Sequence, residues 1–325
     1  MHTVVTGVAG FIGSHLAEVL LAQGHTVTGV DAFTDYYPRP FKEHNLEGLL
    51  GDPRFTFVPG DLLALDLKAL LKGAAWVFHQ AGQAGVRASW GTSFDLYARD
   101  NILATQRLLE AAKDASLQKF VYASSSSIYG DAEAFPTPET TLPKPVSPYG
   151  VTKLAGEHLC HLYWRNYGVP TIALRYFTVY GPRQRPDMAF HTFGRSLLTG
   201  IPIQVYGDGL QTRDFTYISD ALQANLLAAE RGAPGEVFNI GGGSRVTVKD
   251  VLKLMETTAG MHVEVHYQAA QHGDARHTSA DIAKARRLLN YTPRVGIREG
   301  IKAEVDWLKQ VLAWYPQIPG AISNQ

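Results

Sequence analysis

The first half of the chain repeats one arrangement of apolar and polar positions. Short apolar runs are each followed by a longer stretch in which apolar residues recur at helical spacing. Strands that alternate with helices in this way form a parallel sheet with helices on both faces. The pattern therefore predicts an α/β fold with a doubly wound parallel sheet, whose strands lie at residues 3–6, 26–30, 55–58, 76–79, 120–123 and 171–176.

The first apolar run leads into a glycine-rich turn. Gly7, Gly10 and Gly13 follow that strand, and a helix is predicted over residues 12–22. Gly7 allows a tight bend, Gly10 lets the backbone approach phosphate oxygens, and Gly13 lets the helix pack against the sheet. Free N–H groups and the helix dipole then face a bound anion. The turn predicts a pyrophosphate site for a dinucleotide.

An acidic residue, Asp31, closes the second predicted strand. A carboxylate at this point accepts hydrogen bonds from the hydroxyl pair of an adenosine ribose, and it repels the 2′-phosphate of NADP. We therefore expect NAD as the cofactor. A turn aspartate without a ligand is the alternative interpretation.

Beyond residue 176 the alternation of strands and helices is less regular. Thr247 and Asp250 have the spacing of a capping box, and a last helix is predicted to end near Trp314. We predict an NAD-binding Rossmann domain over residues 1–176, with a segment returning to it near 213–242, and a smaller α/β substrate-binding domain over 177–325.

Two predicted helices, over residues 93–115 and 148–167, carry more apolar residues than one buried face needs. Surplus apolar residues on a helix indicate a second contact surface. We therefore expect a homodimer with one or both helices at its interface.

Composition excludes several classes of function. Among the 325 residues, 30 basic and 30 acidic side chains cancel, so we expect neither a nucleic-acid partner nor a membrane partner. The single cysteine, Cys160, cannot form an internal disulfide, and the N-terminus lacks a signal-peptide pattern. The histidines show no convincing metal-ligand spacing. We expect a cytoplasmic protein without a metal site.

The helix predicted at residues 148–167 carries a pair suited to acid–base chemistry. Tyr149 and Lys153 are four positions apart, so both side chains project from one face. An ammonium group and the positive nicotinamide lower the pKa of a nearby phenol, which makes it a better base for alcohol oxidation. Chance can produce such a pair at this composition, so the pair alone does not indicate catalysis. It becomes evidence only together with other motifs nearby.

The strand at residues 120–123 supplies such a feature, because it runs into Ser124 to Ser127. Ligands of a doubly wound sheet bind at strand ends. Ser125 there could hold a substrate hydroxyl while Tyr149 removes its proton. A turn stocked with small hydroxyl residues is the alternative.

Further motifs accompany these residues. The glycine turn, Asp61-Leu62, Asn101 with Thr105, Ser125 to Gly130 and the Tyr149–Lys153 pair together resemble the extended short-chain dehydrogenase/reductase family. Within that family, four segments are similar to nucleotide-sugar epimerases and dehydratases: Arg175-Tyr176-Phe177, Val205-Tyr206-Gly207-Asp208-Gly209, Arg213-Asp214-Phe215 and Asn239-Ile240-Gly241. The resemblance covers most of the chain and implies tightly held NAD and a UDP-sugar substrate between two domains.

The resemblance also implies roles for matching residues. Tyr149 would be base and acid, Ser125 its hydroxyl partner and Lys153 an electrostatic support. The implied cofactor contacts are Gly7, Gly10, Phe11, Ile12 and Gly13 for the pyrophosphate, Asp31 for the ribose, Asp61 and Leu62 for the adenine, and Tyr149, Lys153 and Tyr176 for the nicotinamide half, with Ala81 and Asn101 beside them. The implied substrate contacts are Gln204, Val205 and Tyr206 for uracil and Arg213 and Arg276 for the diphosphate. One departure, His79-Gln80-Ala81-Gly82 in place of His-x-Ala-Ala, predicts a looser loop at Gly82 and less secure cofactor retention.

Members of this family oxidise C4 of the sugar to a ketone. A resembling 4,6-dehydratase would carry Asp-Glu at the positions of Ser126 and Ser127, and a UDP-glucuronate decarboxylase would carry Glu at the second. Their absence favours epimerisation at C4, which needs no further acid or base.

The stretch at residues 177–189 and the segment Gln83 to Arg87 are similar to UDP-glucuronate 4-epimerases. Arg185 offers a planar donor fork for a carboxylate, and Thr178, Ser126 and Ser127 could add hydrogen bonds. We expect conversion of UDP-glucuronate to UDP-galacturonate, with Arg87 as a further substrate contact. A UDP-glucose or UDP-N-acetylglucosamine 4-epimerase with Arg185 in a solvated loop, a decarboxylase and a non-catalytic NAD sensor are the alternatives.

Overall fold

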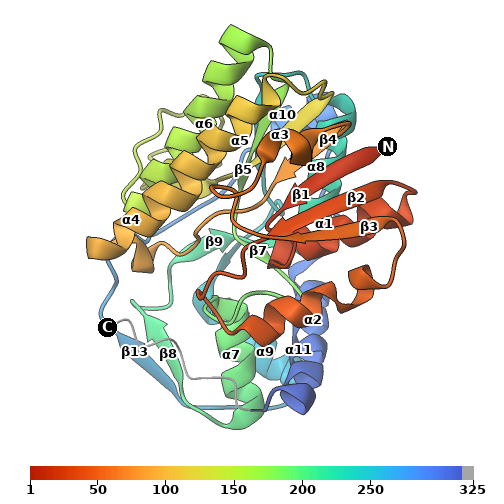
Figure 1. Cartoon of the computed structure of the whole chain (residues 1–325). Coiled ribbons are helices and arrows are strands. Elements are labelled where there is room, and N and C mark those ends of the chain that lie inside the picture. The colour runs from red at the N-terminus through yellow and green to blue at the C-terminus, as the bar shows by residue number, and fades with distance from the viewer. Residues whose placement is uncertain (317–325) are drawn as a thin grey trace.

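The computed structural model describes residues 1–316, so residues 317–325 of the predicted second domain lie outside the described part. A seven-stranded parallel sheet forms its larger part, in the order β11-β6-β5-β4-β1-β2-β3 (Figure 1). The prediction of a doubly wound parallel sheet is confirmed. The strands are β1 (His2–Thr6), β2 (Thr26–Asp31), β3 (Phe55–Pro59), β4 (Trp76–His79), β5 (Lys119–Ser125), β6 (Thr171–Tyr176) and β11 (Val237–Ile240).

The two faces of the sheet carry separate apolar clusters. Val5 of β1 belongs to one cluster and Val4 to the other, because successive side chains of a strand point to opposite faces. The first cluster is completed by α1 (Phe11–Ala22), α2 (Arg39–Leu50), α8 (Ile218–Arg231) and α10 (Ala283–Leu289). The second is completed by α3 (Leu67–Leu71), α5 (Ala104–Ala112) and α6 (Pro148–Tyr167).

The two long predicted helices have different outcomes. Helix α6 matches its predicted range, since the Ser147 hydroxyl accepts from Gly150 N and Gly168 ends the helix at φ 72°. The other region is divided into a 3₁₀ turn η2 (Gly91–Ser93), α4 (Phe94–Tyr97), a π-helical segment η3 (Ala98–Leu103) and α5. Such widened turns are frequent at functional sites, and Arg99 and Asp100 of η3 line the pocket described below.

A smaller part of the chain packs below the carboxyl ends of the strands (Figure 1). Its core joins α7 (Ala189–Thr199), α9 (Val248–Ala259) and α11 (Ile297–Trp314). Three two-stranded sheets border it: β8 (Ile203–Tyr206) with β13 (Val265–Gln268), β7 (Val179–Tyr180) with β10 (Thr216–Tyr217), and β9 (Thr212–Asp214) with β12 (Arg245–Thr247). Between these pieces the chain returns to the large sheet through α8 and β11, which pairs with β6.

A buried chain of hydrogen bonds anchors the carboxyl end of β4. Thr6 Oγ1 and Thr105 Oγ1 lie 2.8 Å and 2.9 Å from the two ring nitrogens of His79. Because Thr105 donates its own hydrogen to Asn101 O, His79 must donate from Nε2 and accept at Nδ1. Burial lowers the pKa of His79 to about 3, so the ring stays neutral.

No helix within residues 1–316 is long and apolar enough to cross a membrane.

Candidate active site

The turn between β1 and α1 has the geometry of an anion site. Gly7 has φ +70°, and its carbonyl oxygen occupies the space that a Cβ at Gly13 would need. Gly7 N and Val8 N both donate to Val30 O, at 2.7 Å and 3.1 Å, which closes the turn against β2. Gly10 caps α1 without a side chain, so the first N–H groups of the helix remain available to a phosphate.

Asp31 ends β2 directly beside this turn, and Asp61 follows the end of β3. Asp31 accepts from Ala9 N at 3.1 Å and from Phe33 N at 2.8 Å, and burial raises its pKa. Asp61 forms an ion pair with Arg99 of η3. Both carboxylates are thus held in place by protein partners before any ligand contacts them.

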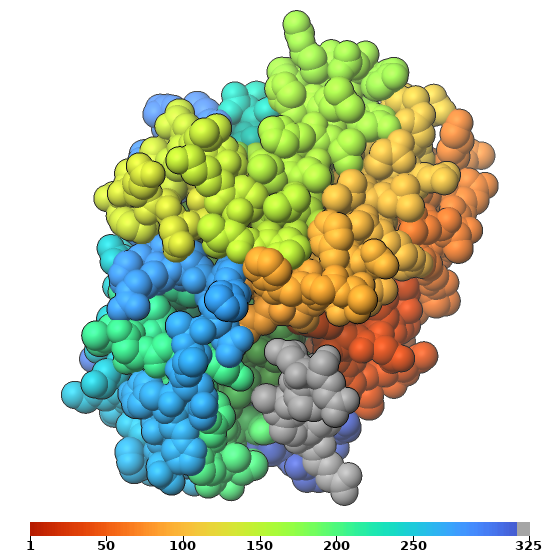
Figure 2. Space-filling view, turned by 90° about the vertical axis from the view of Figure 1, so that its left-hand side faces the viewer, coloured from red at the N-terminus to blue at the C-terminus, as the bar shows by residue number. Residues whose placement is uncertain are grey.

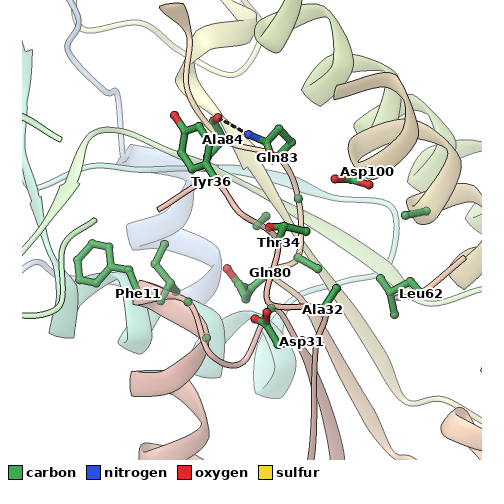
Figure 3. A pocket seen from close by; sticks show the side chains of 18 of the residues that line it. Phe11, Asp31, Ala32, Thr34, Tyr36, Leu62, Gln80, Gln83, Ala84 and Asp100 are labelled. Atoms are coloured by element: carbon green, nitrogen blue, oxygen red, sulfur yellow. Dashed lines mark hydrogen bonds between the residues drawn. The ribbon is translucent and has the colours of Figure 1, made fainter. Parts of the chain in front are cut away.

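One pocket brings most of the predicted cofactor residues together (Figure 3). Asn101 is an exception, because it lies behind the pocket wall, where its Nδ2 donates to Gln83 O and Thr152 Oγ1 at 2.9 Å each. The predicted residues in the lining are Gly7, Gly10, Phe11, Ile12, Gly13, Asp31, Asp61, Leu62, Ala81, Tyr149, Lys153, Tyr176 and Arg185. Sequence reasoning missed Thr34, Tyr36, Tyr37, Lys42, Gln80 and Arg99. The polar and aromatic run directly after Asp31 was the available signal for the first three.

Tyr149 and Lys153 lie in the first turns of α6, beside the end of β5. Lys153 Nζ donates to Ala123 O at 3.1 Å and lies 6.0 Å from the centre of the Tyr149 ring. Burial lowers the pKa of Lys153 to about 8 and raises the pKa of Tyr149 above its ordinary value, while the Ser125 hydroxyl partly counteracts the second effect. Among the protein's own groups, desolvation thus outweighs the Ser125 hydrogen bond and the charge of Arg185. The expected lowering of this pKa, which includes the charge of the nicotinamide, stays a prediction.

A buried ion pair supports this end of the pocket. Arg175 of β6 donates to Glu157 of α6 through Nε, at 3.0 Å, and through Nη2. Both side chains are more than nine-tenths buried. Glu157 also accepts from Ser124 Oγ at 2.8 Å, so one carboxylate joins β5, β6 and α6. Arg175, a motif residue of the family resemblance, lies beneath the site rather than in it.

The residues expected to face the sugar leave neighbouring strands. Ser125 is paired with Tyr176 across β5 and β6, so Ser126–Ser127 and Thr178 follow the carboxyl ends of two neighbouring interior strands. Arg185 lines the same pocket as Tyr149. Its Nε and Nη2 donate to the two oxygens of Asp187 at 3.0 Å each, and Tyr36 also donates to that carboxylate.

Arg183, two residues earlier, points elsewhere. Its guanidinium group donates to Glu18 of α1 at 2.7 Å and to Ser14 at 3.3 Å. The structure thus shows that only Arg185 of this pair of arginines lines the pocket. The sequence alone could not show which of the two side chains points there.

Three arginines gather where the uracil and diphosphate are expected. Arg87 lies over the Tyr206 ring at 4.3 Å and donates to Asp274 at 2.7 Å. Arg276 donates to Asp208, also at 2.7 Å, and Arg213 donates to the carbonyl oxygens of Thr212 and Arg276. These pairings link the loop after β4 to the smaller part of the chain.

The three predicted uracil contacts on β8 differ in how far their side chains are exposed. Gln204 is exposed and accepts from Gln268 Nε2 at 2.8 Å, and Tyr206 is half-buried. Val205 points into the apolar core, with 2% of its surface exposed. Because strand side chains alternate, Val205 can offer a ligand only its backbone.

The loop at Gly82 is packed rather than loose. A Cβ at this position would lie 2.7 Å from Asn101 Oδ1 and 3.2 Å from Lys153 Nζ. The preceding residue is also held, since Ala81 N donates to Thr6 Oγ1 at 3.2 Å. The expectation of a looser loop is therefore not met.

Within residues 1–316, no group of three or more His, Cys, Asp or Glu residues is placed to hold a metal ion.

The sheet and pocket define a Rossmann-type protein with a dinucleotide site at the carboxyl ends of its strands. The chain belongs to the NAD dependent epimerase/dehydratase family, whose model matches residues 3–241.

Three relatives show how closely the chain follows this family. UDP-glucuronic acid 4-epimerase from Bacillus cereus, solved in complex with UDP-glucuronic acid and NAD, has 45% identity and a TM-score of 0.94, covering 96% of this chain and all of that one. UDP-glucuronate 4-epimerase of Thermodesulfobacterium geofontis is 38% identical over 94% of this chain and 96% of its own length. YtcB of Bacillus subtilis, named an uncharacterized UDP-glucose epimerase, is 47% identical over 96% of this chain and 99% of its own.

Proposed function

We propose that this protein is an NAD-dependent UDP-glucuronate 4-epimerase, which interconverts UDP-glucuronate and UDP-galacturonate. The observation that carries this proposal is the presence of Arg185 in the same pocket as Tyr149 and Lys153. A guanidinium fork there suits a sugar carboxylate. The likeness to the Bacillus cereus epimerase supports the same substrate.

In the proposed reaction, Tyr149 removes the proton of the C4 hydroxyl, and Ser125 forms a hydrogen bond to the same oxygen. When bound, NAD would supply a reversible hydride acceptor for C4, and return of the hydride to the opposite face of the 4-keto sugar would invert that carbon. Tyr149 then gives the proton back, so the net change is inversion at C4. The glycine turn, Asp31 and Asp61 hold the cofactor in this proposal, and Lys153 supports the phenolate and the nicotinamide ribose.

The residues around the carboxylate would also protect the intermediate. A 4-keto glucuronate is a β-keto acid and loses carbon dioxide when its carboxylate bond stands perpendicular to the ketone plane. We propose that Arg185, Thr178, Ser126 and Ser127 hold the carboxylate away from that geometry. The bidentate pairing of Arg185 with Asp187 supports this role, because it fixes the direction of the guanidinium plane.

A direct test is incubation of the purified protein with UDP-glucuronate, UDP-glucose and UDP-N-acetylglucosamine in separate reactions, with products identified by NMR. We expect UDP-galacturonate from the first. UDP-glucose 4-epimerisation is the second candidate, which the name of the YtcB relative favours. Turnover of UDP-glucose without turnover of UDP-glucuronate would replace the first proposal by the second.

Replacing Arg185 tests the carboxylate contact. We expect Arg185→Ala to raise the KM for UDP-glucuronate by about 10- to 100-fold, since one charge-assisted hydrogen bond contributes about 1.5–3 kcal/mol, and to release UDP-pentose. Arg183→Ala is the matched control, because Arg183 pairs with Glu18 outside the pocket. Unchanged kinetics of Arg185→Ala without pentose would contradict the role of Arg185.

We further propose a division of labour along the chain. Residues 1–176, with the returning segment near 213–242, would bind NAD, and residues 177–325 would bind the UDP-sugar. The parallel pairing of β11 with β6 supports the returning segment. Gln204, Tyr206 and the backbone of Val205 would border uracil, while Arg87, Arg213 and Arg276 would face the diphosphate.

A homodimer is proposed from the face formed by α4, η3 and α6. Figure 2 looks onto this side, where the surface of residues near 90–110 lies beside that of α6. Exposed apolar side chains on these elements are Phe94, Leu96, Leu103, Val151 and Leu162. Such a patch is suited to contact with a second copy. Sedimentation at twice the monomer mass is the expected result, and a monomer at micromolar concentration would contradict it.

A cytoplasmic location is also proposed. It is supported by Cys160, which is a buried free thiol.

A further inference from the structure

Gln80 takes part in a closed set of hydrogen bonds at one end of the pocket. Its Nε2 lies 3.0 Å from Asn225 Oδ1 and 3.3 Å from the Tyr176 hydroxyl. Tyr176 in turn donates to Asn225 Oδ1 at 2.9 Å. Asn225 is fully buried on α8 and Tyr176 ends β6, so three separate elements meet at these side chains.

This arrangement determines which way the Gln80 amide points. Asn225 Nδ2 donates to Ala221 O at 2.8 Å, so Asn225 must present its oxygen to Gln80. Two carbonyl oxygens do not face each other, and Gln80 therefore directs its nitrogen toward Asn225. Both hydrogens of that nitrogen are then used, one by Asn225 and one by Tyr176. The Gln80 Oε1 is left as an acceptor that receives no hydrogen bond from residues 1–316.

Gln80 lines the pocket together with Tyr149, Lys153 and Tyr176. Figure 3 shows it in the middle of the lining, between Phe11 and Asp31. An acceptor held in this orientation in the pocket lining is placed to receive a hydrogen bond from a donor on the ligand. The nicotinamide half of NAD carries two kinds of donor, the ribose hydroxyls and the carboxamide N–H₂. Tyr149 and Lys153 are the proposed partners of the ribose, which leaves the carboxamide for Gln80.

We propose that Gln80 Oε1 accepts a hydrogen bond from the nicotinamide carboxamide, and that Asn225 and Tyr176 hold Gln80 in the orientation this requires. The inference rests on the proposed NAD cofactor. The contact holds the nicotinamide ring in one rotational position, so that one face of the ring is presented to C4 of the sugar. Gln80 is thus a cofactor-binding residue, and Asn225 is a positioning residue.

The test compares two dinucleotides by their dissociation constants, measured by calorimetry on protein stripped of nucleotide. The 3-acetylpyridine analogue of NAD keeps the carbonyl group but replaces the N–H₂ donor by a methyl group. We expect the wild-type protein to bind NAD about 3- to 10-fold more tightly than the analogue, which is the effect of one hydrogen bond. In Gln80→Leu this preference should disappear.

Gln83→Leu is the matched control, because Gln83 lines the same pocket and the substitution is identical. It should keep the preference for NAD. Gln80→Met is a second variant of similar length in case Gln80→Leu does not fold, and thermal unfolding checks each protein. Equal affinity of the wild-type protein for both dinucleotides, or an undiminished preference in the Gln80 variants, would overturn the inference alone. Binding of neither dinucleotide by the wild-type protein would overturn the proposed NAD function as well.

Discussion

Tyr149→Phe is expected to lower kcat with UDP-glucuronate by about 10²- to 10⁴-fold, because the substitution removes the only proposed acid–base oxygen at C4. The ring itself remains, including its edge contact with Tyr97 at a centroid distance of 6.3 Å, so the fold should be unchanged. NAD should still bind, with the loss of no more than one hydrogen bond to its nicotinamide ribose. Product formation followed by NMR measures the loss, and calorimetric titration with NAD checks the cofactor site.

The matched control for this prediction lies on the same helix. Tyr163 of α6 donates its hydroxyl to Glu110 at 2.6 Å, away from the pocket. Tyr163→Phe makes the same chemical change and should leave kcat unaltered. If Tyr149→Phe kept its kcat within a factor of two of the wild-type value, the phenol could not be the base, and the proposed mechanism would be wrong.

Glu157→Ala is expected to lower the free energy of unfolding by about 3–5 kcal/mol, the usual effect of leaving one charge of a buried pair without its partner. The buried guanidinium group of Arg175 would stay charged, with only the Tyr129 hydroxyl and the carbonyl oxygen of Glu139 as acceptors. Ser124 would also lose its acceptor. Urea unfolding followed by circular dichroism measures the difference.

Two further variants separate the buried charge from the general loss of a contact. In Glu157→Leu combined with Arg175→Met, both charges are removed, so most of the stability should return. Lys302→Ala removes an ion pair with Asp306 that is largely exposed, and it should change the free energy of unfolding by less than about 1 kcal/mol. Equal effects of Lys302→Ala and Glu157→Ala would contradict the importance of burial at Arg175.

Local sequence was sufficient for the elements that define the fold. Each of the six apolar runs became a strand, and the glycine turn formed as expected, because Gly7 takes a positive φ that other residues avoid. Tyr149 and Lys153 share a face of α6 since their spacing is one helical turn. The seventh strand, β11, was not predicted as a strand, because only its pairing with distant β6 makes it part of the sheet.

Long-range contacts decided the parts that sequence reasoning left open or mistook. Arg183 and Arg185 are chemically identical and two residues apart, yet Arg183 pairs with Glu18 of α1 while Arg185 lines the pocket. Burial raises the pKa of Tyr149, which the sequence alone does not show, and the alternation of strand side chains turns Val205 into the core. Gln80 and Asn225 are 145 positions apart, so their contact has no local signature. The sequence by itself therefore determined six strands of the large sheet, the glycine turn and the shared helix face of Tyr149 and Lys153, which depend on neighbours within one or two turns. Only the tertiary structure decided where side chains such as Arg185 and Gln80 point, how deeply they are buried and which residues they contact. These properties depend on which distant surfaces the folded chain brings together.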